Sequence, residues 1–428
     1  MNAAPTTPAL PHPGRGWRAS SAIGAHTVID TFSFVLIALM PVFATRLDLT
    51  DKQTAVLLGV GSVTSGVIQP IVAWASDRLN TRVLGTIAMV IAVVCIGLMG
   101  HARSFSELLA LQALGAMGVG AFHPPAAAAV GALAGSRRTL GMSIFFLAGM
   151  IGGMTGNFLS PKYADAFGVE ALTWLIAPGL LVTALLAFAI HPVSHRAHDA
   201  HETHASLTAD ARRERWQVVW NLYAGNVLRY PVNMALIYLI IAWSRRFVLA
   251  GTDAIALDDQ LAIQASQLNG PLQASMQVGM GGAGLIAGLV LRPAFEKRAL
   301  FLLPMLGAAA IILIPHADRV TYGDALGGRG VQATVFALCV IAGVGFGGLV
   351  PVTMAIAQRM LPHRTSLASG LMLGGAWCFA AVGPAIAERL HHALGLERAF
   401  LITAAALAGA GLIAIALPSR VLSRLAHT

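Results

Sequence analysis

The chain has 428 residues, of which 56% are hydrophobic and only 11% are charged. Soluble globular proteins carry roughly 25% charged residues, so this composition argues against a soluble enzyme, a disordered protein or a nucleic-acid-binding module. The apolar residues form long uncharged runs, which are typical of membrane-spanning helices. Strands of a membrane barrel alternate over about ten residues, so the runs also exclude a barrel.

The formal net charge is +9, and the basic residues cluster in short loops between the apolar runs. That distribution serves membrane topology, so we predict no nucleic-acid partner. Cys95, Cys339 and Cys378 all lie inside apolar runs and do not indicate a disulfide framework. Residues 1–18 lack the apolar core of a signal peptide, and we expect a polar tail there.

Runs of about 20 residues with almost no charge predict an all-α membrane protein of twelve transmembrane helices. In chain order the runs are residues 19–44, 53–76, 83–100, 108–135, 139–161, 171–190, 216–243, 260–291, 299–315, 330–358, 365–387 and 399–417.

An even number of spans places both termini on one side of the membrane. With the termini inside, the cytoplasmic segments hold 17 of the 28 Lys and Arg residues, and the opposite loops hold 10. The positive-inside rule therefore predicts a multi-pass inner (plasma) membrane protein with cytoplasmic termini. The resulting domains are a cytoplasmic tail (1–18), a six-helix bundle (19–190), a cytoplasmic linker (191–215), a second six-helix bundle (216–417) and a cytoplasmic tail (418–428).

The linker is rich in histidine, with His191, His195, His198, His201 and His204. Such a cluster is able to chelate a metal or to sense pH. No cysteine accompanies it, so we predict a solvated linker and no metal site.

The second half of the chain repeats the first at a fixed offset. Adding 227 carries Gly118 to Gly345, Gly120 to Gly347, Pro124 to Pro351, Arg137 to Arg364, Gly156 to Gly383, Gly168 to Gly395 and Glu170 to Glu397. Chance aligns glycines easily, but it rarely aligns proline, arginine and glutamate at the same shift. The earlier spans need a smaller offset, which a polar insertion near residues 318–329 would explain. Two six-helix halves in parallel repeat resemble the major facilitator superfamily of transporters.

The loop after the second span resembles that superfamily's gating motif, Gly-x-x-x-Asp-Arg-x-Gly-Arg-(Arg/Lys). Asp77 and Arg78 match its Asp-Arg core and Arg82 matches its last basic residue, but the two glycines and the middle arginine are missing. In the equivalent loop of the second half, Arg292 stands where an acid is expected. The resemblance therefore implies a charge-based gating loop in the first half only.

Spans one to five resemble the fosmidomycin-resistance type of drug exporter in particular. The residues that carry this resemblance are His26-x-x-x-Asp30, Gln69-Pro70, Gly118-x-Gly120-x-Phe122-His123-Pro124, Arg138 and Met142-Ser143-Ile144-Phe145. The second half shares only the general repeat. The resemblance implies an exporter of small drug-like molecules.

Asp30 and Arg229 are the only charged residues within the twelve predicted spans. A charge at mid-membrane is costly, so each predicts a functional site. At 1.5 Å per residue, Asp30, Arg229 and His123 lie about 16, 20 and 18 Å from the near ends of their spans, close to the midplane. We interpret Asp30 as the proton-exchanging group, tuned by His26 and His123.

Arg229 is the candidate for binding an anionic group of the substrate, because its planar fork is able to hold two oxygens. Asn226 and Asn233 share its helix face, and Gln277 in the eighth span is a further candidate substrate contact. Two other interpretations stay open. Asp30 and Arg229 could form a static pair between the bundles, and His123 could be a hydrogen-bonded ring at a helix contact beside Pro124.

Span five carries Gly149, Gly152, Gly153 and Gly156, a pattern that resembles the glycine-rich antiporter motif of superfamily exporters. Asn157 replaces the proline of that motif, whereas span eleven keeps Gly383-Pro384. The alternative interpretation is close helix packing, for which small residues are common in membranes.

Together these features predict a proton-coupled secondary transporter that exports a small drug-like or anionic molecule as a monomer. No Walker A loop or other catalytic signature occurs, so we predict neither a cofactor nor enzymatic activity. The alternatives are a symporter that takes up an organic anion or sugar, a non-transporting receptor, or a membrane-embedded enzyme. The repeat argues against a channel.

Overall fold

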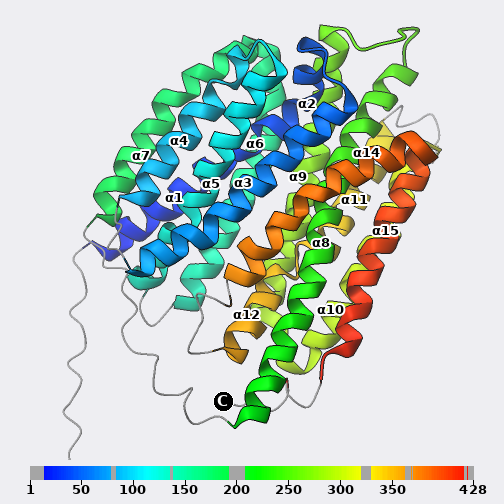
Figure 1. The fold of residues 1–428 in the computed structure, drawn as a ribbon. Coiled ribbons are helices and arrows are strands. Elements are labelled where there is room, and N and C mark those ends of the chain that lie inside the picture. The colour runs from blue at the N-terminus through cyan, green and yellow to red at the C-terminus, as the bar shows by residue number, and fades with distance from the viewer. Residues whose placement is uncertain are drawn as a thin grey trace, which may run out of the picture.

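The structure is a computed structural model of the full chain. It describes residues 14–78, 83–134, 138–191, 208–319, 329–361, 368, 370–418 and 422. Every regular element within these ranges is a helix (Figure 1). The two halves lie side by side, with the blue-to-teal N-terminal half on the left and the green-to-red C-terminal half on the right (Figure 1).

The described part of the first half contains seven α-helices, because its first span is broken at Phe34. The helices are α1 (Arg15–Ser33), α2 (Val35–Arg46), α3 (Asp51–Arg78), α4 (Leu84–Gly97), α5 (Phe105–Ala134), α6 (Arg138–Phe167) and α7 (Ile176–Ile190). The 3₁₀ turns η1 (Met99–His101) and η3 (Val169–Leu175) complete the connections.

The second half follows the same plan. Its main helices are α8 (Ala209–Ala250), α9 (Asp259–Val290), α10 (Glu296–Leu313), α11 (Arg329–Phe346), α12 (Val350–Met360), α14 (Val382–Leu394) and α15 (Leu396–Ile413). Between them lie the turns η4 (Pro293–Phe295), η5 (Ile314–Arg319), η9 (Cys378–Ala381) and η10 (Ala414–Ala416), and the π-helical segment η8 (Leu371–Gly375).

Eleven helical stretches of the described chain are long and apolar enough to cross a membrane, against twelve predicted spans. The exception is the predicted eighth span, which forms the 32-residue helix α9 but is rich in Gln, Asn and Ser. Its amides bond to neighbouring backbone: Asn269 donates to the carbonyl oxygen of Ile37 on α2, and Gln273 to that of Ile237 on α8. The polar residues of α9 are therefore explained by its position, because they form hydrogen bonds with helices of both halves.

The internal repeat is visible in the backbone. Gly168 and Gly395, which the offset of 227 relates, have φ of 78° and 84°, in the region that favours glycine, and each directly precedes the next helical segment. A Cβ added at Gly156 would collide with the carbonyl oxygen of Thr31 on α1, and one added at Gly383 with that of Pro231 on α8. The fifth and eleventh spans thus pack on the first and seventh in the same way.

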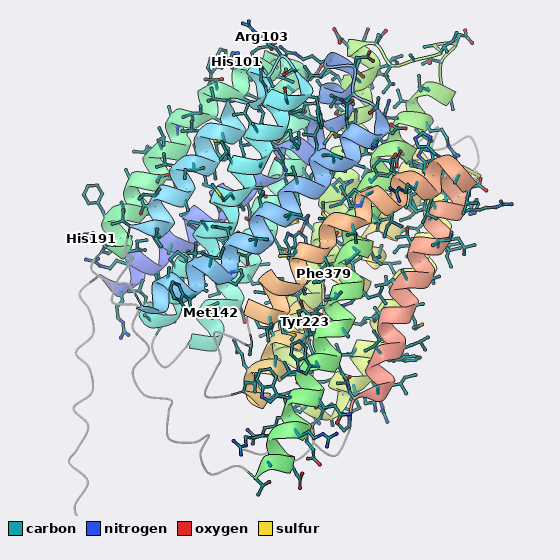
Figure 2. All side chains as sticks on the ribbon, viewed as in Figure 1. His101, Arg103, Met142, His191, Tyr223 and Phe379 are labelled. Carbon is teal, nitrogen blue, oxygen red and sulfur yellow. The ribbon has the colours of Figure 1, made fainter. Side chains whose placement is uncertain are left out.

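The placement of the helix ends agrees with an even number of spans. The start of α1 and the end of α15 lie at the same end of the molecule (Figure 1). His191, after the sixth span, lies at the opposite end from His101 and Arg103, which follow the third (Figure 2). The two-bundle arrangement is therefore confirmed, whereas the side of the membrane on which the termini lie stays a prediction.

Candidate functional site

Two residues of α1 and one of α5 form a polar cluster, which we call the His–Asp cluster (His26, Asp30 and His123). His26 and Asp30 lie one turn apart on the same face of α1, with His26 Nε2 3.3 Å from Asp30 Oδ2. His123 Nε2 lies 3.1 Å from His26 Nε2 and 3.5 Å from Asp30 Oδ1. The side chains of His26 and Asp30 are buried, and that of His123 is partly buried. The structure thus brings together all three predicted proton-coupling residues.

Backbone carbonyls determine which ring nitrogen of each histidine carries its hydrogen. His26 Nδ1 lies 2.7 Å from the carbonyl oxygen of Phe145, and His123 Nδ1 lies 2.7 Å from that of Val119. Because a carbonyl oxygen only accepts, both Nδ1 atoms donate. A neutral ring then has no hydrogen on Nε2. Two Nε2 lone pairs and a carboxylate therefore face one another, and a proton between them turns repulsion into hydrogen bonds.

Helix α6 fixes the position of the His–Asp cluster from one side. The His26 ring stacks on Phe145, with ring centroids 3.9 Å apart. A Cβ added at Gly149 would lie 2.6 Å from Asp30 Oδ2, closer than atoms pack. Gly149 therefore leaves the space that the His26–Asp30 pair occupies.

The His–Asp cluster also has the spacing of a metal site, since one ligand atom from each residue lies within 4.8 Å of the others. The donor set of two imidazoles and one carboxylate is one that transition metals accept. The sequence predicts no metal, and the donor–acceptor count described above requires only a proton.

A second polar cluster lies in the C-terminal half, and we call it the arginine cluster (Asn226, Arg229 and Thr353). Arg229 is only 3% exposed, and its Nη2 donates to Asn226 Oδ1. Asn226 Nδ2 donates to the carbonyl oxygen of Met372 at 3.0 Å and to Thr353 Oγ1 at 3.4 Å. The Nη1 atom of Arg229 is buried and has no hydrogen-bond partner among the residues that the structure describes.

The arginine cluster borders a cavity of about 20 Å³. Its lining comes from α8, α10, α12, α15 and η10 and from the residues Leu349 and Leu417, all in the second half of the chain. Asn226 and Arg229 line it, as predicted from their shared helix face, but Asn233 and Gln277 do not. Asn233 is buried elsewhere on α8, and Gln277 on α9 faces Gly153 of α6 across the boundary between the halves.

The two clusters occupy equivalent positions in the two halves. The contacts of Gly156 with Thr31 and of Gly383 with Pro231 relate α1 to α8 by an offset of 200. That offset carries His26 to Asn226 and Asp30 to Tyr230, and the offset of 227 carries Phe145 to Met372. The bond from His26 to the Phe145 carbonyl therefore has its counterpart in the bond from Asn226 to the Met372 carbonyl.

The static Asp30–Arg229 pair, one of the alternatives from the sequence, is absent among the described side chains. Both ion-pair partners of Asp30 are histidines of its own half. Arg229 instead bonds to Asn226. The two charges within the predicted spans thus belong to separate sites.

The glycines of span five make close contacts between helices. Beyond Gly149, added Cβ atoms at Gly152 and Gly156 would collide with α1, and one at Gly153 would lie 2.9 Å from Phe34. Gly383 packs on α8, and Pro384 is buried beside it. This geometry is what the packing interpretation expects, and a role of the motif in transport direction stays a prediction.

The gating loop contributes no described side chain. Helix α3 ends at Arg78, the side chains of Asp77 and Arg78 are not described, and Arg82 lies outside the described residues. The linker histidines after His191 also lie outside them.

The sequence analysis missed an ion cluster at the other end of α3. Asp51 lies 3.0 Å from Arg245 on α8 and 3.1 Å from His392 on α14, so it joins the N-terminal half to the C-terminal half. These residues stand in loops or at helix ends, where charges are ordinary. Only the fold reveals that they meet.

Known proteins resemble this chain over nearly its whole length. The fosmidomycin resistance protein of Escherichia coli (strain K12) is 24% identical over 388 residues, which cover 89% of this chain and 87% of that protein. An uncharacterized MFS-type transporter of Bacillus subtilis (strain 168), YfnC, is 22% identical over 92% of this chain and 91% of its own.

Solved structures share the fold. A bacterial homologue of the human lysosomal transporter Spinster, in an inward-facing and unoccupied conformation, has a TM-score of 0.67 at 15% identity and covers 96% of this chain and 98% of its own. A bacterial homologue of the human drug peptide transporters PepT1 and PepT2 also has a TM-score of 0.67, at 14% identity, with 96% and 99% covered.

The model of the Major Facilitator Superfamily matches residues 22–327, well over half of the chain. This protein therefore belongs to the Major Facilitator Superfamily and is a multi-pass membrane transporter of small molecules, not an enzyme.

Proposed function

We propose that the protein is a proton-coupled exporter of a small drug-like or anionic molecule in the inner membrane. The observation that carries the proposal is the His–Asp cluster, in which two imidazole lone pairs and a carboxylate converge within 3.5 Å. Such an arrangement is stable when it holds a proton and unfavourable when it does not. Proton occupancy then biases the equilibrium between the two arrangements of the bundles, which is how a gradient drives alternating access.

The helix contacts support this role. His26 and Asp30 pack on α6 through Gly149, and His123 comes from α5. A change in the charge of the cluster therefore acts on the packing of three helices at once. Gln277 is the candidate substrate contact, because its Oε1 is buried beside α6 of the other half and has no hydrogen-bond partner in the described ranges.

The relative named for fosmidomycin resistance suggests the substrate class and the direction of transport. A strain that lacks the gene should become more sensitive to one or more compounds in an antibiotic panel that includes phosphonates. Restoring the wild-type gene should restore growth, whereas Asp30→Asn should not. Equal growth of the deletion and wild-type strains on every compound would count against export.

Inverted vesicles test direction and coupling together. If the protein exports its substrate in exchange for protons, a substrate identified in the panel accumulates in the vesicles when their lumen is acidified. Uptake by symport predicts the opposite response to the same gradient. Adding EDTA should change nothing, because a proton and not a metal occupies the cluster. A loss of transport in EDTA would replace the proton proposal with a metal-dependent one.

A further inference from the structure

The arginine cluster is unusual because a buried charge has no ionic partner. Arg229 is 3% exposed, and no ion pair joins it to an acidic side chain among the residues that the structure describes. Burying a guanidinium without a counter-charge is strongly unfavourable. Something other than a protein carboxylate should therefore balance it.

The hydrogen bonds around Arg229 leave one side of the guanidinium free. The carbonyl of Met372 fixes the Asn226 amide by accepting from its Nδ2, so Asn226 Oδ1 is turned toward Arg229 Nη2. Within the described part of the chain, Nη1 then has no acceptor. Arg229 also lines the adjacent cavity, whose size of about 20 Å³ suits one water-sized or slightly larger particle.

We propose that this cavity binds a small inorganic anion of the chloride class, held by Arg229 as a fixed counter-ion. A water molecule would satisfy the Nη1 hydrogen bond but would leave the charge unbalanced. The head group of a substrate would need an approach from between the bundles. The lining instead comes entirely from the second half of the chain. The inference does not depend on proton coupling at the His–Asp cluster.

Salt-dependent stability of the purified full chain tests the proposal directly. Melting temperature is measured in sodium chloride, sodium bromide and sodium gluconate at equal ionic strength. Because a ligand that binds only the folded state stabilises it, chloride and bromide should raise the melting temperature saturably, and gluconate should not. Identical curves in all three salts would overturn the proposal.

Two variants connect the response to the cavity. Arg229→Gln should abolish the rise in melting temperature with chloride. Gly225→Ala should weaken the apparent chloride affinity by roughly tenfold because the methyl group takes up space in the cavity. Its Cβ would lie 3.9 Å from the carbonyl oxygen of Ala410, an ordinary contact, so the variant should fold. If Arg229→Gln fails to fold, Gly225→Ala still decides the outcome.

Gly409→Ala is the matched control. Gly409 lies on α15 outside the cavity lining, and its added Cβ would meet only Leu228 at 3.6 Å. This variant should keep the wild-type chloride response. An unchanged response in Gly225→Ala would contradict the site.

Methylphosphonate distinguishes a resident ion from a substrate head group. Sodium methylphosphonate should give no stabilisation that depends on Arg229 and should not displace bromide. If it stabilises the wild type but not Arg229→Gln, while chloride does nothing, the site receives an organic anion and the inorganic-ion proposal is wrong. An Arg229-dependent bromide peak in anomalous diffraction would locate the ion itself.

Discussion

The His–Asp cluster and the arginine cluster stand at equivalent places in the two halves but carry opposite chemistry. In both, a side chain on the first helix of the half donates to a backbone carbonyl on the fifth span of the same half. These bonds run from His26 to Phe145 and from Asn226 to Met372. Both halves keep that bond, which an imidazole supplies in one and an amide in the other. What the N-terminal half adds is the second ring nitrogen of His26, which faces Asp30 and His123.

The difference shows that equivalent positions of a repeated fold can carry groups with different chemical roles. The N-terminal cluster consists of three groups that are able to gain or lose a proton. The C-terminal cluster instead has a guanidinium, which is effectively always charged, with an amide and one hydroxyl around it. One half is therefore suited to respond to protons, and the other to hold a constant charge.

The largest effect is expected for Asp30→Asn. The amide keeps the size of the carboxylate but cannot bind a proton between the histidines, so proton-driven transport should fall by at least 100-fold, in the range of lost acid–base groups. Expression and melting temperature should stay close to wild type. Transport in liposomes with an imposed pH gradient measures the effect. Tyr230→Phe, at the equivalent position, should lose only one hydrogen bond to Met372 and keep gradient-driven transport.

If Asp30→Asn retains gradient-driven transport, the His–Asp cluster does not carry the coupled proton. If Asp30→Asn and Tyr230→Phe lose gradient-driven transport equally, the two halves do not have the different roles described above.

Gly149→Ala should reduce transport by roughly tenfold or more. Its methyl group would lie 2.6 Å from Asp30 Oδ2, so the carboxylate or α6 must move, and displacement of a positioned group by about 1 Å is costly. The equivalent residue in the second half is already alanine, Ala376. The reverse change, Ala376→Gly, should cost about 1 kcal/mol of stability and leave transport intact. Comparable transport in both variants would show that the cluster tolerates displacement.

His26→Asn is expected to reduce coupling by several-fold to tenfold without unfolding the protein. Asn226 demonstrates that an asparagine in this place reaches the facing carbonyl. The variant therefore keeps the bond to that carbonyl and loses Nε2. The measurement is the ratio of protons to substrate moved. A wild-type ratio would confine His26 to a packing role.

The sequence predicted the fold well because its signals are local. Long uncharged runs gave the spans, and Pro124, Gly168 and Glu170 gave the repeat without any knowledge of contacts. The helical spacing of His26 and Asp30 put them on one face, and the resemblance of the Gly-x-Phe-His-Pro stretch drew attention to His123. Their meeting required α5 to lie beside α1, which the fold confirms.

Other features could not be predicted because they depend on contacts between distant segments. Arg229 and Asn233 share a helix face in sequence, yet only Arg229 reaches the cavity. That Arg229 has no acidic partner and no acceptor for Nη1 among the described residues is visible only once the neighbouring helices are placed. The break at Phe34 and the role of Gly149 are likewise consequences of packing.

Arg229→Lys should have a moderate effect, a few-fold in anion affinity. Lysine keeps the charge but loses the planar fork, so it cannot bond to Asn226 and reach the cavity at once. The double variant Asp30→Asn/Arg229→Gln should show no rescue of expression, since no ion pair joins the two residues in the structure. If expression of the double variant exceeds the sum of the single effects, Asp30 and Arg229 form an ion pair after all.

The smallest effect is expected for Asp51→Asn, which tests a contact between the halves that neither polar cluster contains. Asp51 bonds to Arg245 and His392, but Asp51 and Arg245 are partly exposed and His392 is exposed, and such ion pairs contribute little, about 0–1 kcal/mol each. Their removal should shift the population of bundle arrangements by a few-fold and leave the proton-to-substrate ratio unchanged. Distances between spin labels on the two halves measure that shift. Asp48→Asn is the control, because this acid lies three residues before Asp51, in the turn that precedes α3, and has no ion pair among the described residues. A changed coupling ratio in Asp51→Asn would mean that proton exchange is not confined to the His–Asp cluster, because an acid outside it would then take part.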